Sequence, residues 1–184
     1  MRSWFRLPPP LPQNEQQRQR EVDLLATGSD TLPDLDEIAT AAASLFRAPA
    51  ALVTIVDKDK VLVIGSFNAQ VRSMHRAEAL CAHGVAQPGE VLCVPDLLED
   101  ERFAHLPITR GAEPIRFYVG TPLVTASGSA LGMLCVVDRF ARPRPAVEYH
   151  QALRRLATAA LARLRRRETQ ASEADLAAVR TGRA

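Results

Sequence analysis

The sequence predicts an α+β domain built around an antiparallel sheet, and three observations carry that prediction. Two apolar runs, 50–56 and 61–67, are separated by a short polar turn, as in a β-hairpin. A second pair of runs, 115–125 and 131–137, is separated by a turn that contains Gly128. Apolar residues recur at helical spacing near both ends of the chain. Helices grouped at the ends of hairpin-linked strands are typical of the α+β class.

The composition excludes several other classes of protein. Of 184 residues, 47% are apolar and 24% are charged, which is ordinary for one soluble globular domain. The net charge of +2 is too small to favour nucleic acid or an anionic membrane surface as a partner. No apolar stretch approaches the ~20 residues that span a bilayer, and the N-terminus does not resemble a secretory signal. Three cysteines in apolar segments indicate a reducing compartment, so we expect a cytoplasmic protein.

The N-terminal half should contain two helices before the first hairpin. An extended proline-rich segment is expected over 1–13. A helix over 14–26 should follow, N-capped by its first residue, an asparagine. The second helix should begin after Pro33, with Asp34 or Asp36 as its cap, and it should present a broad apolar face to the sheet.

The C-terminal half should contain the loop-rich part of the fold and the last helix. Residues 68–90 should be irregular or briefly helical, 90–94 a short strand, and 96–105 a short helix or loop. The last helix is expected over 145–168, with its arginines on a solvated face. The predicted organisation is an extended segment, a domain and a flexible tail, over residues 1–13, 14–168 and 169–184.

Several segments of this chain resemble one family, the bacterial GAF domains. The stretch LPQNEQQRQREVDLL resembles their leading helix, and LFRAPAALVTIVDKDK resembles their first strand and hairpin. LCAHGV resembles a segment of their cap. Over 95–138 the chain follows the family pattern nearly position by position, including the signature DLLEDERF that begins at Asp96. By this resemblance, the chain is identified as a member of the family over about residues 14–165.

The resemblance implies an antiparallel sheet of about six strands, with helices on one face and a loop-rich cap over a small-molecule pocket on the other. Members of this family sense ligands such as cyclic nucleotides, tetrapyrroles, amino acids or gases, and many only dimerise. Family membership leaves the ligand and any cofactor of this chain unknown. Because no output domain follows residue 165, we expect the signal to leave through a partner protein.

We further expect a homodimer built from the first and last helices. The last helix carries a second apolar set, Leu156 and Ala160, which would be exposed unless another helix packs on it. The alternative is that Val22 and Leu25 of the first helix cover this set within one chain, which would then be a monomer.

Cys81 and His83 are the most reactive pair of residue types in the cap segment. Bilin-binding members of the family place cysteine and histidine next to each other. Ala82 separates the two here, so we expect no covalent chromophore, and the spacing matches no zinc signature. The favoured interpretation is a packed Cys81 with His83 hydrogen-bonded across the cap. The alternative is that His83 lines the ligand pocket beside Cys81.

The strand around Tyr118 should present two different faces, because side chains alternate along a strand. Its apolar set, which includes Ile115, should pack on the helices. Arg116 and Tyr118 should then face the cap, where they can form the floor of a ligand site. An ion pair of Arg116 with Asp96 or Glu113 is an equally good interpretation.

The cap signature also places Asp100 two residues before Arg102. A carboxylate and a guanidinium at this spacing can pair and pin the cap, and Arg102 can instead contact the ligand. The predicted ligand-binding residues are Cys81, His83, Arg102, Arg116 and Tyr118.

We expect a non-enzymatic sensory or regulatory domain that binds a small ligand and signals through its terminal helices to a partner protein. No nucleophile, base and orienting group are recognisable as a set, so no catalytic residue and no metal site is predicted. One alternative is a structural dimerisation or adaptor module with a collapsed pocket. A second is a thiol enzyme similar to the free methionine-sulfoxide reductases, with Cys81 and Cys93 as nucleophile and resolver.

Overall fold

The computed structural model of the protein describes residues 8–25 and 32–180. Within these residues, six strands form one antiparallel sheet in the order β3-β2-β1-β6-β5-β4. The helices and strands in chain order are α1 (Glu15–Leu24), α2 (Pro33–Phe46), β1 (Ala50–Val56), β2 (Lys60–Phe67), β3 (Ser73–His75), η1 (Arg76–Glu78), α3 (Leu80–Gly84), β4 (Leu92–Val94), α4 (Pro107–Arg110), β5 (Phe117–Val124), β6 (Ala130–Asp138) and α5 (Val147–Arg180).

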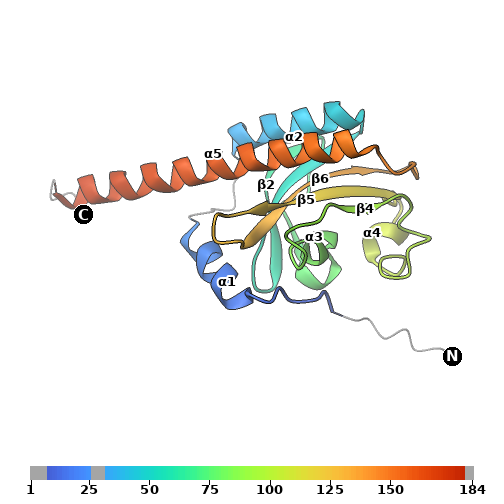
Figure 1. Cartoon of the computed structure of the whole chain (residues 1–184), viewed down its shortest axis with the longest axis horizontal. Coiled ribbons are helices and arrows are strands. Elements are labelled where there is room, and N and C mark those ends of the chain that lie inside the picture. The colour runs from blue at the N-terminus through green and yellow to red at the C-terminus, as the bar shows by residue number, and fades with distance from the viewer. Residues whose placement is uncertain (1–7, 26–31, 181–184) are drawn as a thin grey trace.

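Two layers cover the two faces of this sheet. The helices α2 and α5 pack on one face, and a cap of η1, α3, α4 and long loops covers the other (Figure 1). We call these the helix face and the cap face. The arrangement confirms the predicted fold class, an antiparallel α+β domain with its helices on one side.

The strand β1 shows how the sequence dictates this sandwich. Ala51, Val53 and Ile55 belong to the apolar core under the helices, whereas Leu52 and Val56 belong to the core under the cap. Side chains alternate along a strand, so each face receives every second residue. Because both faces are covered, the strand is apolar at every position except Thr54, whose hydroxyl bonds the backbone of Met133, rather than alternating with polar residues.

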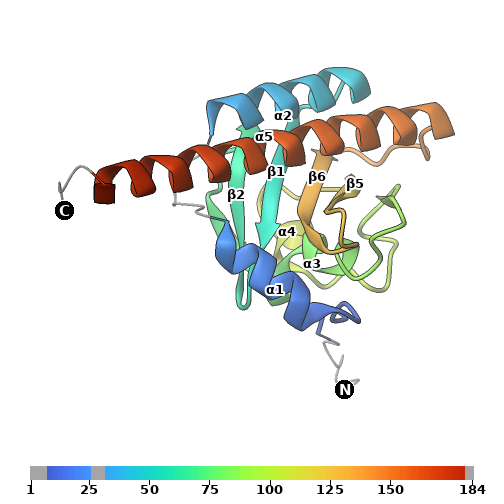
Figure 2. The same ribbon diagram turned by 60° about the vertical axis from the view of Figure 1, so that its left-hand side comes forward.

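The first helix does not pair with the last, contrary to expectation. α1 crosses the end of the sheet where the hairpins turn, while α2 packs alongside α5 (Figure 2). α1 buries only Arg18, Gln19 and Val22 of its ten residues, and so narrow an apolar stripe cannot cover a sheet face. Of the second apolar set of α5, Ala160 is fully buried within the chain on this helix-covered face, whereas Leu156 is only partly buried.

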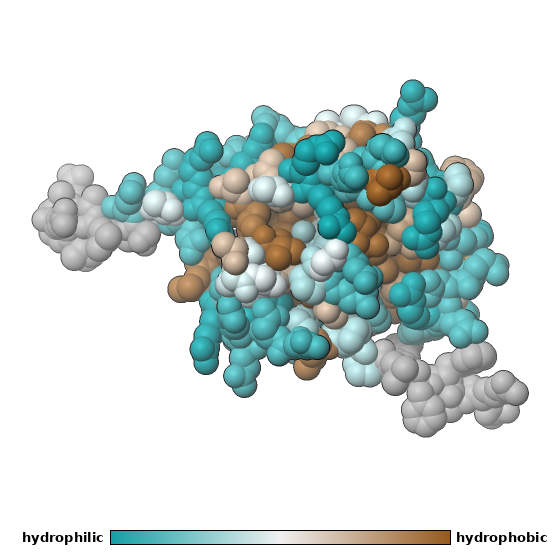
Figure 3. Space-filling model, viewed as in Figure 1, coloured by the Kyte–Doolittle hydropathy of each residue, from teal (hydrophilic) through white to brown (hydrophobic). Residues whose placement is uncertain are grey.

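The last helix is longer than expected. It continues past Glu168 to Arg180, because residues 169–180 are rich in good helix formers and contain neither glycine nor proline. The rest of the expected tail, 181–184, lies outside the described residues. On the exposed side of α5 lie Arg154, Arg155 and Arg165. Figure 3 shows hydrophilic residues around the rim of the molecule and apolar residues gathered nearer its middle.

Smaller differences concern caps and loops. Neither predicted aspartate caps α2: Leu32 is the N-cap residue, and Asp36 instead accepts a hydrogen bond from the backbone of Ser66 at 2.7 Å. Asn14 is at the N-cap position of α1, but its side chain donates to the Ser129 hydroxyl at 3.2 Å. The short edge strand β3 was not predicted, and of the two alternatives for residues 96–105, a short helix or a loop, the structure contains turns. Of the N-terminal segment, residues 1–7 lie outside the described residues, as does 26–31.

Candidate functional site

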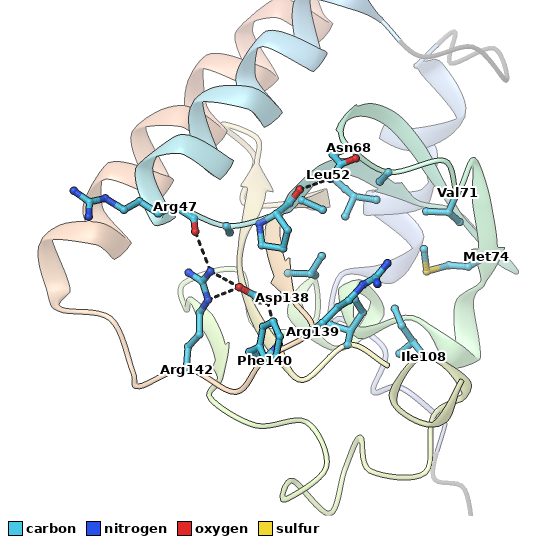
Figure 4. Close-up of a pocket in the computed structure, with 16 residues that line it drawn as sticks. Arg47, Leu52, Asn68, Val71, Met74, Ile108, Asp138, Arg139, Phe140 and Arg142 are labelled. Carbon is cyan, nitrogen blue, oxygen red and sulfur yellow. Dashed lines mark hydrogen bonds and ion pairs between the residues drawn. The ribbon is translucent and has the colours of Figure 1, made fainter. Parts of the chain in front are cut away.

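A cavity of about 760 Å³ lies on the cap face, at the end of the sheet where β1 begins and β6 ends. Its lining comes from four parts of the chain: residues 47–52, 68–74, 108 with 115, and 137–142. Figure 4 shows side chains from the sheet, from the loop after β2 and from the cap converging around it. Such a volume falls within the range of roughly 300–1,000 Å³ that is usual for small-molecule sites.

The walls of the cavity are apolar. Leu52 of β1 and Val137 of β6 form the sheet side, Met74 of β3 closes one flank, and Ile108 and Ile115 come from the cap. All five pack with the cap-side core. Ile115 was expected on the helix face. It precedes the first residue of β5, so the alternation of the strand does not determine its direction, and it packs under the cap instead.

Arg142 stabilises the polar end of the cavity. Its guanidinium pairs with Asp138, with 2.7 Å between Nε and Oδ2. It also donates to the backbone carbonyls of Phe46 at 2.7 Å and Arg47 at 2.9 Å. These bonds join the end of β6 to the end of α2 (Figure 4). Since its donors are engaged within the protein, Arg142 holds the site in shape rather than offering a free charge to a ligand.

The neighbouring Arg139 is differently placed, at the open rim. It pairs with Glu113 through a bond of 2.8 Å from Nη1, and the two side chains are 54% and 67% exposed. Exposed ion pairs contribute little, about 0–1 kcal/mol, so a ligand anion can replace this carboxylate. Phe140, which is 77% exposed, lies beside it at the mouth. The rim thus combines an arginine in an exposed ion pair with an exposed aromatic ring.

Arg116, one of the two residues of the predicted ligand floor, is paired with Asp96. The Nε of Arg116 donates to Asp96 Oδ1 at 2.7 Å, and a second bond makes the pair bidentate. Hydrogen bonding from Arg116 lowers the pKa of Asp96, against the smaller opposing effect of burial. Of the alternatives left open by the sequence, the structure contains the ion pair with Asp96, while Glu113 pairs with Arg139.

Arg102, Asp100 and His83 form a second group of cap side chains, which contact one another or the ring of Phe103. Arg102 binds both carboxylate oxygens of Asp100, at 2.9 and 2.6 Å, and its guanidinium lies 4.7 Å from the ring centre of Phe103. The His83 ring meets the same phenyl ring edge-on at 4.9 Å. Burial, and next the positive charge of Arg102, lower the pKa of His83. The pairing of Arg102 with Asp100 is the one that an interpretation of the signature predicted. The favoured prediction for His83 was wrong: among the described residues its side chain packs on Phe103 and makes no hydrogen bond across the cap.

Cys81 and Tyr118 are buried side by side beneath the cap. The Cys81 sulfur lies 3.7 Å from the Tyr118 hydroxyl. The phenol fits because Gly120 has no side chain: a Cβ there would come within 2.6 Å of the hydroxyl oxygen. Hydrogen bonding from Cys135 lowers the pKa of Cys81, and burial raises the pKa of Tyr118. Tyr118 therefore faces the cap as predicted, but its side chain fills space instead of lining it.

The third cysteine is separated from this group by the sheet. Cys93 packs in the helix-side core, whereas Cys81 and Cys135 pack in the cap-side core. Burial raises the pKa of the Cys93 thiol. Cys81 and Cys93 thus lie on opposite faces, which does not suit the predicted roles of nucleophile and resolver.

The structure therefore separates the predicted residues from the cavity. None of the five predicted ligand-binding residues lines it, so their role in binding stays a prediction. Sequence reasoning missed the apolar residues of the lining that lie in short, turn-rich segments, such as Val71, Met74 and Ile108. These residues show no helical or strand periodicity in the sequence, so no pattern marks them as the wall of a cavity. Among the described residues, no group of three His, Cys, Asp or Glu side chains is suited to a metal ion. No described helix is long and apolar enough to cross a membrane.

A six-stranded antiparallel sheet, two covering helices and a capped cavity define a sensory-type α+β domain. The chain belongs to the GAF domain family, whose sequence model matches residues 31–165. This family is sensory and regulatory in character, and the predicted family assignment is confirmed.

One curated relative and two solved structures illustrate the family's range. A Pseudomonas aeruginosa protein named cyclic di-GMP phosphodiesterase is 40% identical over 134 residues, which is 71% of this chain but 22% of that protein. The GAF domain of a Coxiella burnetii phosphoenolpyruvate-protein phosphotransferase has a TM-score of 0.62 at 16% identity, covering 85% of this chain and 96% of that one. A free methionine-R-sulfoxide reductase from Neisseria meningitidis has a TM-score of 0.57 at 14% identity, covering 82% and 90%. The fold is thus shared by regulatory domains and enzymes.

Proposed function

We propose that this GAF domain is a non-enzymatic sensory module that binds a small molecule in the cavity beside Met74 and Val137. The observation that carries the proposal is the 760 Å³ cavity between sheet and cap, with apolar walls and a polar rim. Small-molecule sites combine these features: apolar surface provides affinity, and a few polar groups fix orientation. The positions of Cys81 and Cys93 on opposite faces support a role in binding over thiol catalysis.

The lining favours a ligand with an apolar body and an anionic or hydrogen-bond-accepting end. The apolar body would lie against Leu52, Met74 and Val137, which expose little polar surface to it. The accepting end would lie at the rim, where Arg139 can exchange Glu113 for the ligand. Arg142 is held by Asp138 and by two backbone carbonyls, so it would maintain the shape of the cavity and would not form an ion pair with the ligand.

The signal would pass to a partner protein that acts on cyclic di-GMP. This part of the proposal is supported by the Pseudomonas aeruginosa relative, of which the chain covers 22%. The matched region is the GAF part of the chain, so regulation rather than phosphodiester hydrolysis is the function inferred for it.

Native mass spectrometry of the purified chain, followed by thermal shift assays against a panel of small acidic and aromatic compounds, tests the proposal. A bound species should disappear in Ile108→Trp, which fills the cavity, and persist in the matched control His83→Ala, which lies outside it. A ligand at 100 times its Kd should add about 2.7 kcal/mol of stability to the wild type. Binding that survives Ile108→Trp but is lost in His83→Ala would instead move the site to the residues predicted from the sequence.

A second candidate function is a dimerisation or adaptor module, and two observations favour it. Arg102 and Arg116 are satisfied by internal carboxylates, and Tyr118 fills the space beneath the cap. α5 also extends well beyond the sheet, which provides a helix for a homodimer (Figure 1). Sedimentation equilibrium of the full chain and of a truncation after Glu168 tests this candidate. A full chain that stays monomeric at tens of micromolar, where weak dimers usually form, argues against it.

A further inference from the structure

The helix α1 is attached to the sheet mainly by polar contacts. It lies across the tips of the β1–β2 and β5–β6 hairpins, at the end of the sheet away from the mouth of the cavity (Figure 2). Its buried side chains are Arg18, Gln19 and Val22, two of which are polar. Gln19 donates to Asp57 in the β1–β2 turn at 2.7 Å. An attachment of this composition depends on exact pairing of charges, because unpaired buried polar groups are costly.

One carboxylate, Glu15, holds two buried guanidinium groups. Arg18 of the same helix binds it at 2.6 and 2.9 Å, and its side chain is fully buried. Arg76, which lies in η1 on the far side of the β1–β2 turn, binds it at 2.7 Å. Burial alone would raise the pKa of Glu15, but the two arginines outweigh it and lower the pKa to about 2. Glu15 is therefore charged at every physiological pH. It is the carboxylate with which both arginines pair, while Arg18 also donates to the backbone carbonyl of Val56 and Arg76 to that of Asp57.

Arg76 connects this network to the wall of the cavity. It follows β3 directly, and Met74 of β3 lines the cavity together with Ala69 and Val71 of the preceding loop. The backbone nitrogen of Arg76 donates to the backbone carbonyl of Asp59 at 2.9 Å. Within the described part of the chain, its buried Nη2 has no hydrogen-bond partner. A shift of β3 would thus move a guanidinium whose main anionic partner is on α1.

A separate attachment of α1 does not involve the cavity. Glu21 accepts hydrogen bonds from the hydroxyls of Ser127 and Ser129 at 2.6 and 2.7 Å, in the β5–β6 turn. Neither serine lines the cavity. The helix thus has several attachments, including those of Gln19 to Asp57 and of Asn14 to Ser129, and the one at Glu15 leads to the cavity wall.

From this arrangement we infer that the docking of α1 and the conformation of the cavity wall are coupled through the contact between Arg76 and Glu15. With α1 docked, Glu15 holds Arg76 and so holds β3 and the 69–74 segment against the cavity. When α1 leaves, Arg76 loses its counter-ion and the wall becomes free to move. By reciprocity, a ligand that shifts the wall changes the docking of α1 by the same factor. The inference rests on the proposed function for its ligand, but the coupling itself is a property of the unliganded chain.

Hydrogen exchange measured by mass spectrometry on the full chain, without ligand, tests the coupling. In Glu15→Gln, amides in both 15–24 and 69–75 should exchange about tenfold faster or more than in the wild type. Arg76→Lys, which keeps a positive charge but loses the forked geometry, should accelerate the same two segments to a smaller extent. The matched control Glu21→Gln removes only the bonds to the β5–β6 turn and leaves the contact of Glu15 with Arg76 in place, so 69–75 should exchange as in the wild type even where the C-terminal end of α1 exchanges faster.

Two results would overturn the inference. One is faster exchange in 15–24 alone for Glu15→Gln and Arg76→Lys. The other is equal acceleration of 69–75 in Glu21→Gln, which would mean that the wall loosens although the contact of Glu15 with Arg76 is still in place. If Glu15→Gln unfolds as a whole, seen as fast exchange throughout β1 and β6, the milder Arg76→Lys decides between these outcomes. Since no ligand is used, a negative result here leaves the native mass spectrometry result standing, and the reverse also holds.

Discussion

The cap covers two regions of the sheet that differ in almost every respect. Around Tyr118, charged and polar side chains pair with one another, and the space beneath them is filled. Around Val137 the side chains are mostly apolar, and a cavity of about 760 Å³ lies between them. Both regions belong to the same cap-side core and both are built from segments of the same family pattern.

The difference shows that conspicuous residues and open space need not coincide. Arg102 and Arg116 are attractive ligand-binding residues in a sequence because they are charged, but a guanidinium at the surface of the cap also pairs readily with a carboxylate nearby. Asp100 and Asp96 supply these partners within a few residues or across a strand. Space for a ligand instead arises where loops diverge and only apolar residues face each other, as between Met74 and Ile115.

The largest expected effect on stability comes from removing the side chain of Tyr118, which fills the space beneath the cap. Tyr118→Ala should destabilise the protein by about 3–5 kcal/mol, because it removes a fully buried aromatic ring and leaves a void above Gly120. Urea unfolding followed by circular dichroism measures this change. The control Tyr118→Phe loses only a hydroxyl and should cost about 1 kcal/mol or less. An alanine variant as stable as the wild type would show that this region is not packed as described.

An intermediate effect is expected at the polar end of the cavity. Asp138→Ala should cost about 1.5–3 kcal/mol, since it leaves the Arg142 guanidinium without its carboxylate in a partly buried site. Arg139→Met, one residue along the chain, breaks an exposed pair and should change stability by about 0–1 kcal/mol. Parallel thermal and urea unfolding of both variants tests the contrast. Equal losses would contradict the distinction between a structural arginine and one available to a ligand.

The smallest effect expected is a pH dependence arising from His83. Its pKa is lowered below 6.5, first by burial and next by Arg102, so the unfolded chain binds the proton first as the pH falls. The contribution of His83 to the free energy of unfolding should therefore be fully present above about pH 7. It should decline as the pH is lowered through 6.5 towards the pKa of His83 in the folded protein. Urea midpoints measured between pH 8 and about pH 5 follow this decline.

His83→Gln provides the control for that titration. It should flatten the decline without abolishing it, because the pKa of His150 is also lowered by burial and contributes with the same sign. A slope that does not change in His83→Gln would mean that His83 is not protected from protonation by the fold.

Much of the fold follows from the sequence alone. The bounds of β1, the two hairpins and the cap-facing direction of Tyr118 were predicted correctly, because alternation and turn chemistry are local properties. The pairing of Arg116 with Asp96 was one of the stated alternatives, since the sequence offers a carboxylate for the arginine to pair with. Apart from this pair, which is 20 positions apart, these predictions depend on neighbours along the chain or across one turn.

Other features depend on distances that no local pattern encodes. β3 has three residues, too few for a period of two to be recognised, and its position depends on pairing with β2. The place of α1 is decided by Glu15 and Arg76, which are 61 positions apart. The cavity likewise depends on how far the loop after β2 stays from Ile108 in α4. Sequence patterns can identify charged residues that pair with each other. The cavity lies between apolar residues from distant segments, and its position depends on the three-dimensional structure.

The length of α5 has a mechanical consequence. Its 34 residues span roughly 51 Å at 1.5 Å per residue, and packing against the sheet holds it as far as Leu164. The remaining turns, to Arg180, form an arm of roughly 24 Å. A rigid helix acts as a lever, so a tilt of about 10° where it leaves the sheet would displace its tip by about 4 Å, close to the rise of one turn. A rearrangement of side chains too small to alter the fold would thus be converted at the end of α5 into a movement that a neighbouring protein surface can detect.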